Sequence, residues 1–361
     1  MAKITHIVEP TLTDEAGHCF SFITNLSKAS EETQFILWAD HLSKLTSLGK
    51  NVELKKYFFR KVRKIQCFFL YKKLLDTPDK ILISTASRLD MAIFIWIARD
   101  IIPKNKVYFY FHWINSSPKK LIQLKKLAIM QPNLVILGPT ATVISAFQEA
   151  GFKQISIVPY PSSVNISIKS EQALPFKSVW YAGAARQDKG FGKVVDLIKY
   201  VNDLGLNIPF TLQTSPDHYG KYDDATKSDI TRLHRIPYKY IKIYSDTLSN
   251  DQYKSNFLGA ICIQPYLASD FADRISGVTL DALLTGSPIV CSEGTWTARQ
   301  VERFKAGIVF NSTSPADMLD SIEKVITDYE HYSKNARLAS QTLQKEHSST
   351  HLAKILAETI D

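Results

Sequence analysis

The residue types and spacing best suited to chemistry lie between Asp273 and Asp281, in the second half of the chain. A helix is expected to begin there, and the first amides of a helix lack intrahelical acceptors and carry the positive end of its dipole. Ser276, Gly277 and Val278 could therefore hold a phosphate group without a metal ion. Asp281 is placed to accept hydrogen bonds from a ribose diol, and Asp273 from sugar hydroxyls. The simpler interpretation is that both acids only complement the helix dipole.

A second candidate phosphate site is the loop from Gly183 to Gly190, which reads Gly-Ala-Ala-Arg-Gln-Asp-Lys-Gly. Its small residues would let a phosphate approach the backbone, and Arg186 and Lys189 could neutralise a diphosphate at the end of the preceding strand. The alternative is an ordinary turn that carries two solvated cations.

These motifs, in this order, resemble those of the retaining nucleotide-sugar transferases of the GT-B fold, glycosyltransferase family 4 in particular. That family typically has Glu-x7-Glu before Gly-x-Pro-Val-Val, and here Asp273 and Asp281 precede Gly-Ser-Pro-Ile-Val at residues 286–290. It also has Gly-Arg-x4-Lys-Gly, of which Gly183 and Lys189 keep the spacing. The resemblance implies that Lys189 and Asp273 act in catalysis. The donor-binding set that it implies is Gly17, Gly183, Arg186, Lys189, Ser276, Gly277, Val278 and Asp281.

Three departures from the family pattern affect four positions. Both acids are aspartates where the family usually has glutamates, so each carboxylate reaches one methylene less far. Ala184 stands where the family has an arginine, which Arg186 could replace, and Ser276 stands where it has a glycine. These differences leave the donor sugar open, and they also allow a site that binds without catalysing.

The first half of the chain is expected to bind the acceptor. Gly17 lies where the family has a glycine-rich turn near the diphosphate, and His18 beside it could contact donor or acceptor. His112 ends the strand expected at 107–111, and in related enzymes a histidine at such a strand end lies near the reacting centre. We therefore assign His112 to acceptor positioning or proton handling. Arg88 is a further acceptor-side candidate, and simple packing is the alternative for both histidines.

Short apolar runs alternate with amphipathic stretches, which predicts parallel sheets covered by helices on both faces. The predicted strands are residues 4–8, 35–39, 81–84, 107–111, 134–137, 155–158, 178–181, 210–213, 241–244, 260–264, 288–292 and 307–310. The predicted helices are residues 20–30, 91–101, 140–151, 190–204 and 278–284, with a helical tail that begins at the Ser314-Pro315 start signal.

A segment rich in proline and serine, residues 159–175, separates the two halves and has the composition of a linker. We therefore expect an α/β chain of the GT-B class, with two Rossmann-like, doubly wound domains that face each other across a cleft. Residues 1–165 would form the acceptor domain and residues 176–344 the nucleotide-sugar donor domain. A C-terminal helix at about 345–361 is expected to pack back on the first domain.

The formal net charge of +9 favours a polyanionic partner. Basic and aromatic residues interleave at 55–73, and lysines gather again at 119–126, which suits an anionic membrane surface. A solvated helix face is the alternative, and nucleic acid is not expected because no known nucleic-acid-binding motif occurs. The four cysteines lack disulfide or zinc spacing and the N-terminus does not resemble a signal peptide, so we expect a cytoplasmic protein or one peripheral on the inner face of the cell membrane.

The sequence contains no Asp-x-Asp pair, no Walker A motif and no Gly-x-Gly-x-x-Gly fingerprint. We therefore expect a metal-independent, retaining glycosyltransferase of the hexosyl type, with no cofactor and no metal site. It would move a sugar from a nucleotide-diphosphate sugar to a hydroxyl of a glycan or lipid-linked acceptor in polysaccharide or lipopolysaccharide assembly. A nucleotide-sugar epimerase and a non-catalytic scaffold protein that binds nucleotide sugars are the alternatives. Nucleotide release that depends on an acceptor would argue against the epimerase.

Overall fold

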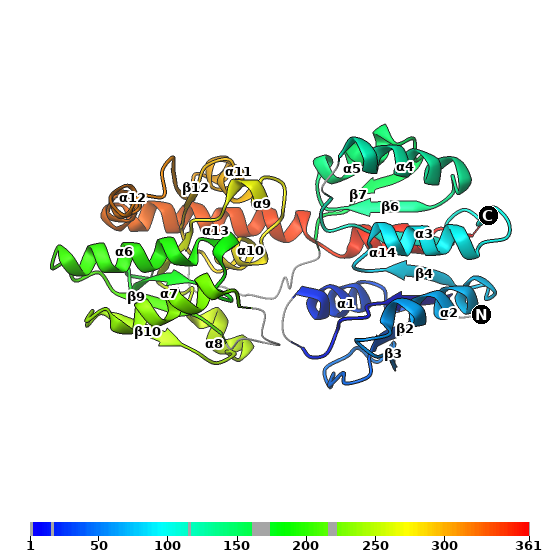
Figure 1. The fold of residues 1–361 in the computed structure, drawn as a ribbon, viewed down its shortest axis with the longest axis horizontal. Helices are drawn as coiled ribbons and strands as arrows, with labels where there is room; N and C mark the ends of the chain where they lie inside the picture. Colours follow the sequence, from blue (N-terminus) through cyan, green and yellow to red (C-terminus); the bar gives the residue numbers. More distant parts are fainter. Residues whose placement is uncertain (1–2, 16–17, 115–116, 161–173, 216–221, 361) are drawn as a thin grey trace. The chain divides into compact units, whose positions relative to one another are not determined.

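The computed structural model describes residues 3–15, 18–114, 117–160, 174–215 and 222–360. The chain divides into two compact units, Met1–Ser163 together with His347–Asp361, and Val164–Glu346. We call them unit 1 and unit 2. Most of the segment predicted as a linker, and Gly17, lie outside the described residues. Each unit has a parallel sheet with helices on both faces (Figure 1), so the predicted fold of two Rossmann-like, doubly wound domains is confirmed.

The sheet of unit 1 has its described strands in the order β3-β2-β1-β4-β5-β6-β7, and every pairing is parallel. The strands are β1 (Lys3–Val8), β2 (Thr33–Asp40), β3 (Val52–Phe58), β4 (Lys80–Ile83), β5 (Val107–Tyr110), β6 (Val135–Gly138) and β7 (Gln154–Ile157). The central strands β4, β5 and β6 are buried along their whole length, as is expected where helices cover both faces of a parallel sheet.

Helices on the two faces of this sheet build two separate cores. One core holds side chains of α2, α3, α4 and α5, and the other holds those of α1 and α14. The bounds are α1 (His18–Ala29), α2 (Arg63–Leu75), α3 (Arg88–Ile97), α4 (Pro118–Met130), α5 (Ala141–Glu149) and α14 (Thr350–Ala357). The C-terminal helix α14 thus belongs to unit 1, where it packs against α1 (Figure 1).

The sheet of unit 2 has the strand order β10-β9-β8-β11-β12-β13, which is the order 3-2-1-4-5-6 of a Rossmann fold. The strands are β8 (Ser178–Tyr181), β9 (Phe210–Gln213), β10 (Ile241–Tyr244), β11 (Ala260–Gln264), β12 (Ile289–Ser292) and β13 (Gly307–Phe310). The helical segments are η1 (Gln187–Lys189), α6 (Phe191–Asp203), α7 (Asp224–Arg235), α8 (Asn250–Ser255), α9 (Ala268–Phe271), α10 (Gly277–Leu284), α11 (Trp296–Phe304), α12 (Pro315–Thr327) and α13 (Tyr329–Glu346).

Local signals explain several of these boundaries. Ser314 caps α12 by accepting a hydrogen bond from the amide of Asp317, with Pro315 at the first helical position as predicted. Thr140 caps α5 in the same way. The basic stretch at 55–73 is not one continuous element, because its first residues lie in strand β3 and most of the remainder forms helix α2.

The strand order places a topological switch point in each unit, where neighbouring strands lead to opposite sides of the sheet. The switch lies between β1 and β4 in unit 1 and between β8 and β11 in unit 2. Ligands of open α/β sheets bind outside the carboxyl ends of the strands at such points. The loops after β8 and β11 are therefore the first place to look for a ligand site.

Within the described part of the chain, the helices are too short or too polar to cross a membrane.

Candidate functional site

The loop after β8 brings Gly183 next to Lys189. The backbone of Gly183 has φ +92, and a Cβ placed there would lie 3.1 Å from the Lys189 Nζ and 3.8 Å from Val278 Cγ2. The amide of Gly183 donates to the Gln213 side chain at the end of β9, at 2.9 Å. A glycine here leaves open space in front of the ammonium, and a side chain would fill that space.

Lys189 is a partly buried cation of the loop after β8. Within the described ranges its ammonium makes neither a hydrogen bond nor an ion pair, and the centre of the Tyr266 ring lies 5.9 Å from the Nζ. Burial lowers the pKa of Lys189 to about 8, and the positive charge of Arg186 adds to this effect. A desolvated ammonium of this kind gains most from an anionic ligand that replaces the lost hydration.

Gly190 ends the short helix η1 and begins α6 with a left-handed backbone, φ +67. A Cβ at Gly190 would lie 2.0 Å from the carbonyl oxygen of Pro265, in the loop after β11. The two loops of the switch point therefore touch each other through a position that only glycine can occupy.

Gly190→Ala should lower thermal stability and remove ligand binding at this site. Gly205→Ala is the matched control, because Gly205 also has φ +67 but nothing lies within 4 Å of its added Cβ. Both variants carry the left-handed strain of about 1 kcal/mol, which costs roughly 2–4 °C in a chain of this size. Only Gly190→Ala adds the clash with Pro265. Equal melting temperatures for the two variants would contradict this account of the loop.

The start of α10 faces the same region. Ser276 caps the helix, its hydroxyl accepting from the amide of Thr279 at 3.3 Å. The amides of Gly277 and Val278 precede the first intrahelical donor, and Gly277 is exposed, with no atom within 4 Å of where a Cβ would lie. Because Val278 also approaches Gly183, the α10 amino terminus and the Lys189 loop border one space.

Asp281 lies one turn into α10, where the Tyr253 hydroxyl donates to its Oδ2 at 3.1 Å. Burial raises the pKa of this carboxyl to about 6, although the Tyr253 hydrogen bond acts in the opposite direction. The Tyr253 hydroxyl contacts only one oxygen of this carboxylate, and the charge is poorly solvated. The carboxylate can therefore accept hydrogen bonds from further hydroxyl groups.

Asp273 lies in the loop before α10, where it forms an ion pair with Arg299 of α11 at 3.0 Å. Both side chains are almost half exposed, so the pair contributes little to stability. It does fix the direction of the Asp273 carboxylate. Arg299 gave no signal in the sequence because it lies 26 positions further along the chain.

Two residues that sequence reasoning missed complete the site. Arg274, next to Asp273, reaches the Asp188 carboxylate at 3.7 Å and stacks over the ring of Phe271 at 5.0 Å. The Tyr266 hydroxyl is buried without a hydrogen-bond partner among the described residues. Arg274 could have been found as a cation inside the candidate motif, whereas nothing in the sequence marks Tyr266.

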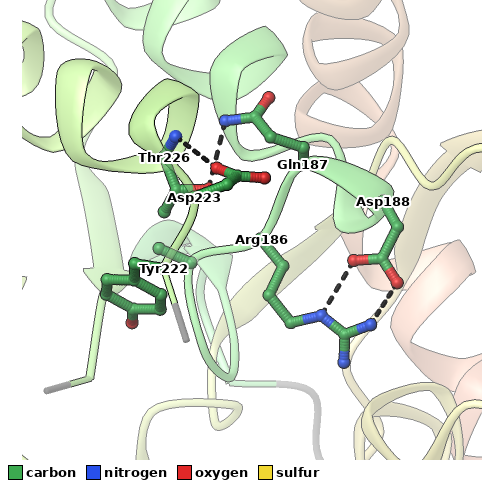
Figure 2. A pocket seen from close by; sticks show the side chains of 7 residues that line it. Arg186, Gln187, Asp188, Tyr222, Asp223 and Thr226 are labelled. Atoms are coloured by element: carbon green, nitrogen blue, oxygen red, sulfur yellow. Dashed lines mark hydrogen bonds and ion pairs between the residues drawn. The ribbon is translucent and has the colours of Figure 1, made fainter. Parts of the chain in front are cut away.

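A pocket of about 210 Å³ lies beside the loop (Figure 2). The Arg186 guanidinium and the Asp188 carboxylate form a two-point ion pair in its wall, with Nε and Oδ1 2.8 Å apart (Figure 2). The residues that line the pocket are Ala185, Arg186, Gln187, Asp188, Tyr222, Asp223 and Thr226.

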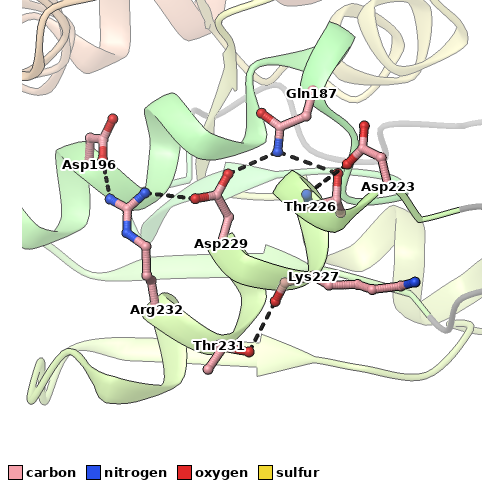
Figure 3. A network of polar contacts seen from close by, with 8 residues as sticks. All are labelled: Gln187, Asp196, Asp223, Thr226, Lys227, Asp229, Thr231 and Arg232. Carbon is pink, nitrogen blue, oxygen red and sulfur yellow. Dashed lines mark hydrogen bonds and ion pairs between the residues drawn. The ribbon is translucent and has the colours of Figure 1, made fainter.

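A polar network anchors the loop to α7 (Figure 3). Gln187 donates to Asp229 at 2.8 Å, and Arg232 donates to the same carboxylate at 2.7 Å and also contacts Asp196 on α6. Asp229 is nearly buried, so removing one of its donors would leave a poorly solvated charge. The network therefore holds the backbone of 186–189 in one conformation.

In unit 1, His112 lies two residues beyond β5, with its Nε2 2.9 Å from the carbonyl oxygen of Ser84. Because a carbonyl only accepts, the Nε2 carries the proton of this hydrogen bond. Ser84 in turn donates to Glu9 Oε2 at 2.8 Å, and Glu9 also accepts from Thr85 and Thr11. Glu9 is fully buried at the β1–β4 switch point. Sequence reasoning missed this carboxylate, although an acid directly after a strand was a usable signal.

The other two acceptor-side candidates are Arg88 and His18. Arg88 begins α3, and its guanidinium donates to Gln123 on α4 at 3.0 Å. His18 is the first residue of α1, but its side chain is outside the described part of the structure. His112, Ser84 and Glu9 are thus the residues of this edge that the structure brings together.

The described residues contain no group of three or more His, Cys, Asp or Glu side chains that could hold a metal ion.

Comparison with known structures identifies the fold. No protein-family model matches the sequence, and no curated protein matches it significantly. The chain has the GT-B fold, as the sequence predicted, because its structural neighbours are GT-B glycosyltransferases matched over nearly their full length.

Three of these neighbours illustrate the likeness. Sucrose-phosphate synthase from Thermosynechococcus elongatus has a TM-score of 0.70 and 12% identity, with 98% of each chain covered. Anabaena HepE, solved with UDP and glucose, has a TM-score of 0.68 and 13% identity, with 99% of each chain covered. WaaG, a glycosyltransferase involved in lipopolysaccharide biosynthesis, has a TM-score of 0.67 and 13% identity, with 98% of this chain and 99% of that chain covered.

Proposed function

We propose that this protein is a metal-independent, retaining glycosyltransferase that moves a sugar from a nucleotide-diphosphate sugar to a hydroxyl of a glycan or lipid-linked acceptor. The observation that carries the proposal is the Lys189 ammonium, which has lost hydration and lies beside Gly183 and the amino terminus of α10. Asp281 lies one turn further along that helix. An uncompensated cation, helix amides without intrahelical acceptors and a carboxylate that accepts from hydroxyls are what a nucleoside diphosphate requires.

The catalytic part of the proposal assigns each group a task. Lys189 and the amides of Gly277 and Val278 stabilise the charge that develops on the leaving diphosphate, as fixed donors do in other enzymes. Asp281 accepts from the ribose hydroxyls, and Asp273 orients the donor sugar. Lys189, Arg186 and the amides at the start of α10 stand in for the metal ion that other sugar transferases use, so activity should persist in EDTA.

The acceptor would bind to unit 1 at the carboxyl edge of its sheet. His112, whose Nε2 donates to the Ser84 carbonyl, would position the acceptor hydroxyl or handle its proton. The buried Glu9 holds Ser84 and Thr85 by hydrogen bonds and so fixes the loop on which His112 rests.

A thermal-shift screen against UDP-, GDP- and dTDP-sugars tests the donor side. Anabaena HepE was solved with UDP, so UDP-glucose is the first donor to try. A ligand present at one hundred times its Kd stabilises a protein by about 2.7 kcal/mol, an easily measured shift. Nucleotide release that requires an added acceptor would support transfer, and release without any acceptor would argue for a different reaction.

We also propose that unit 1 attaches peripherally to an anionic bilayer on the inner face of the cell membrane. Helices α2, α3 and α4 lie side by side and expose Phe69 (60%), Trp96 (77%) and Ile129 (80%). Exposed lysines lie on α2 and α4 as well, among them Lys64, Lys72, Lys119, Lys125 and Lys126. Apolar side chains that enter the headgroup region beside lysines that meet anionic lipids are typical of interfacial binding.

The triple variant Phe69→Ser, Trp96→Ser, Ile129→Ser should bind vesicles of anionic lipid at least about tenfold more weakly, because it removes one large exposed apolar side chain from each of the three helices. Vesicle co-sedimentation at low salt measures this binding. The matched control is Leu204→Ser with Leu338→Ser, two exposed leucines of unit 2 at 51% and 52%. Retention equal to that of the control would contradict the proposed surface.

A further inference from the structure

One carboxylate, Asp188, stands among three cations of the donor site. Arg186 holds it with two hydrogen bonds, and the Arg274 Nη1 lies 3.7 Å from the same oxygen that Arg186 Nη2 contacts. Lys189 is the next residue, and its pKa is lowered by burial and then by the charges of Arg186 and Arg274. All three cations therefore lie close to the same carboxylate, and Asp270 also attracts Arg274 through space.

The cations are held on a common support. The Phe271 and Tyr266 rings stack on each other with centroids 4.4 Å apart. The Arg274 guanidinium lies over Phe271 and the Lys189 ammonium over Tyr266. Since the Tyr266 hydroxyl is buried and has no hydrogen-bond partner among the described residues, this aromatic shelf also offers an unsatisfied polar group close to the cations.

The charges of this cluster do not balance without a ligand. Three positive charges, those of Arg186, Lys189 and Arg274, outnumber the acids near them, because Asp188 is the carboxylate in direct contact with Arg186 and Arg274 and Asp270 adds a weaker attraction to Arg274. A nucleotide-sugar diphosphate carries two negative charges. The Asp188 side chain lines the pocket of Figure 2, while its carbonyl accepts from the Leu267 amide at 3.0 Å.

We propose that Asp188 takes the place of a phosphate in the unliganded site and that the donor diphosphate displaces it, so that Arg274 becomes a third cation on the diphosphate. This inference rests on the proposed function. In the unliganded protein Asp188 keeps Arg186 and Arg274 from repelling each other. When the diphosphate binds, the Asp188 carboxylate turns into the pocket and the two guanidinium groups pair with phosphate oxygens.

The test uses Asp188→Asn and Arg274→Gln in the full chain, with binding of UDP-glucose and of inorganic pyrophosphate measured by calorimetry at one pH. Asp188→Asn removes the competing anion, so it should bind both ligands roughly three- to fivefold more tightly while the unliganded protein melts at a lower temperature. Arg274→Gln should weaken both ligands about tenfold. In the double variant the gain from Asp188→Asn should shrink, because part of it acts through Arg274.

The binding results show whether the diphosphate displaces Asp188. If Asp188→Asn binds pyrophosphate equally well or more weakly than the wild type, Asp188 is a permanent support and the inference is overturned while the proposed function stands. Unchanged binding in Arg274→Gln also overturns it. If the wild type binds neither pyrophosphate nor any nucleotide sugar of the thermal-shift screen, both the inference and the proposed function fail. Asp223→Asn is the control, because Asp223 lines the same pocket but caps α7 and contacts none of the three cations.

Discussion

Replacing Lys189 with alanine should lower the rate of sugar transfer by about 100- to 1,000-fold, the usual cost of removing one fixed donor that stabilises transition-state charge. The ammonium is the cation of the site that has lost hydration without gaining an ion pair among the described residues. An anionic ligand must therefore replace the hydration that the Lys189 ammonium has lost. Initial rates of nucleotide release, with saturating donor and acceptor, measure the effect on kcat.

The Lys189→Ala protein should remain folded, because burial of the ammonium costs stability and alanine removes that cost. Lys193→Ala is the matched control, since Lys193 is an exposed lysine one turn into α6 and should leave the rate unchanged. Lys189→Arg keeps the charge and should retain part of the activity. A Lys189→Ala enzyme with wild-type kcat would show that the ammonium has no part in the reaction.

The affinity for the donor should have a bell-shaped pH profile, with a plateau between about pH 6 and about pH 8. The Asp281 carboxyl must be ionised to accept from the ribose hydroxyls, and its pKa in the unliganded site is raised to about 6 by burial. The Lys189 ammonium must be protonated to meet the diphosphate, and burial lowers its pKa to about 8. Affinity should therefore fall by up to roughly tenfold per pH unit on either side of the plateau.

Two variants test whether Lys189 causes the alkaline side of this pH profile and Asp281 the acidic side. Arginine stays protonated throughout the range, so Lys189→Arg should lose the alkaline limb and keep the acidic one. Asp281→Asn should bind weakly and lose the acidic limb. A nucleotide sugar is the right probe, because each phosphorus of its diphosphate has one ester bond, one anhydride bond and a single strongly acidic oxygen, so the diphosphate does not titrate near neutral pH. A flat profile in the wild type would contradict the assignment of these two groups.

The same shifts predict how stability changes with pH when no donor is present. A carboxyl whose folded pKa is raised from 3.8 to about 6 contributes stability that is fully present below pH 3.8 and is lost as the pH rises through about 6. Asp281→Asn should therefore stabilise the unliganded protein above pH 6 while it weakens donor binding. A functional group that lowers the stability of the unliganded protein is common in binding sites.

The fold class could be predicted from the sequence because it depends on periodicity. The apolar runs that become β4, β5 and β8 are short and bounded, and buried parallel strands produce that pattern. Strand β3 and helix α7 were missed for the opposite reason. Strand β3 is only partly buried at the edge of its sheet, and α7 has few apolar residues, so neither shows a strong pattern.

The candidate site could be predicted only where its residues are close in sequence. Gly183 and Lys189 share one loop, and Asp273, Ser276 and Asp281 share another, so spacing alone suggested them. Their partners come from elsewhere: Tyr253 reaches Asp281 from α8, and Arg299 reaches Asp273 from α11.

Contacts in the structure change the expected roles of Arg186 and Asp281. Arg186 was expected to face a diphosphate directly, but in the unliganded site it pairs with Asp188. Asp281 was expected as a free acceptor, but one of its oxygens is already held by Tyr253. Such pairings depend on how the loops after β8 and β11 meet, which no local spacing reports.

The most direct test of the central claim is a calorimetric titration of the wild-type protein, in EDTA, with the nucleotide sugar that stabilises it most. We expect saturable binding at one site per chain, weakened at least about tenfold by Lys189→Ala and by Asp281→Asn but not by Lys193→Ala. Binding that is unchanged in both site variants, or that requires a divalent metal ion, would contradict it.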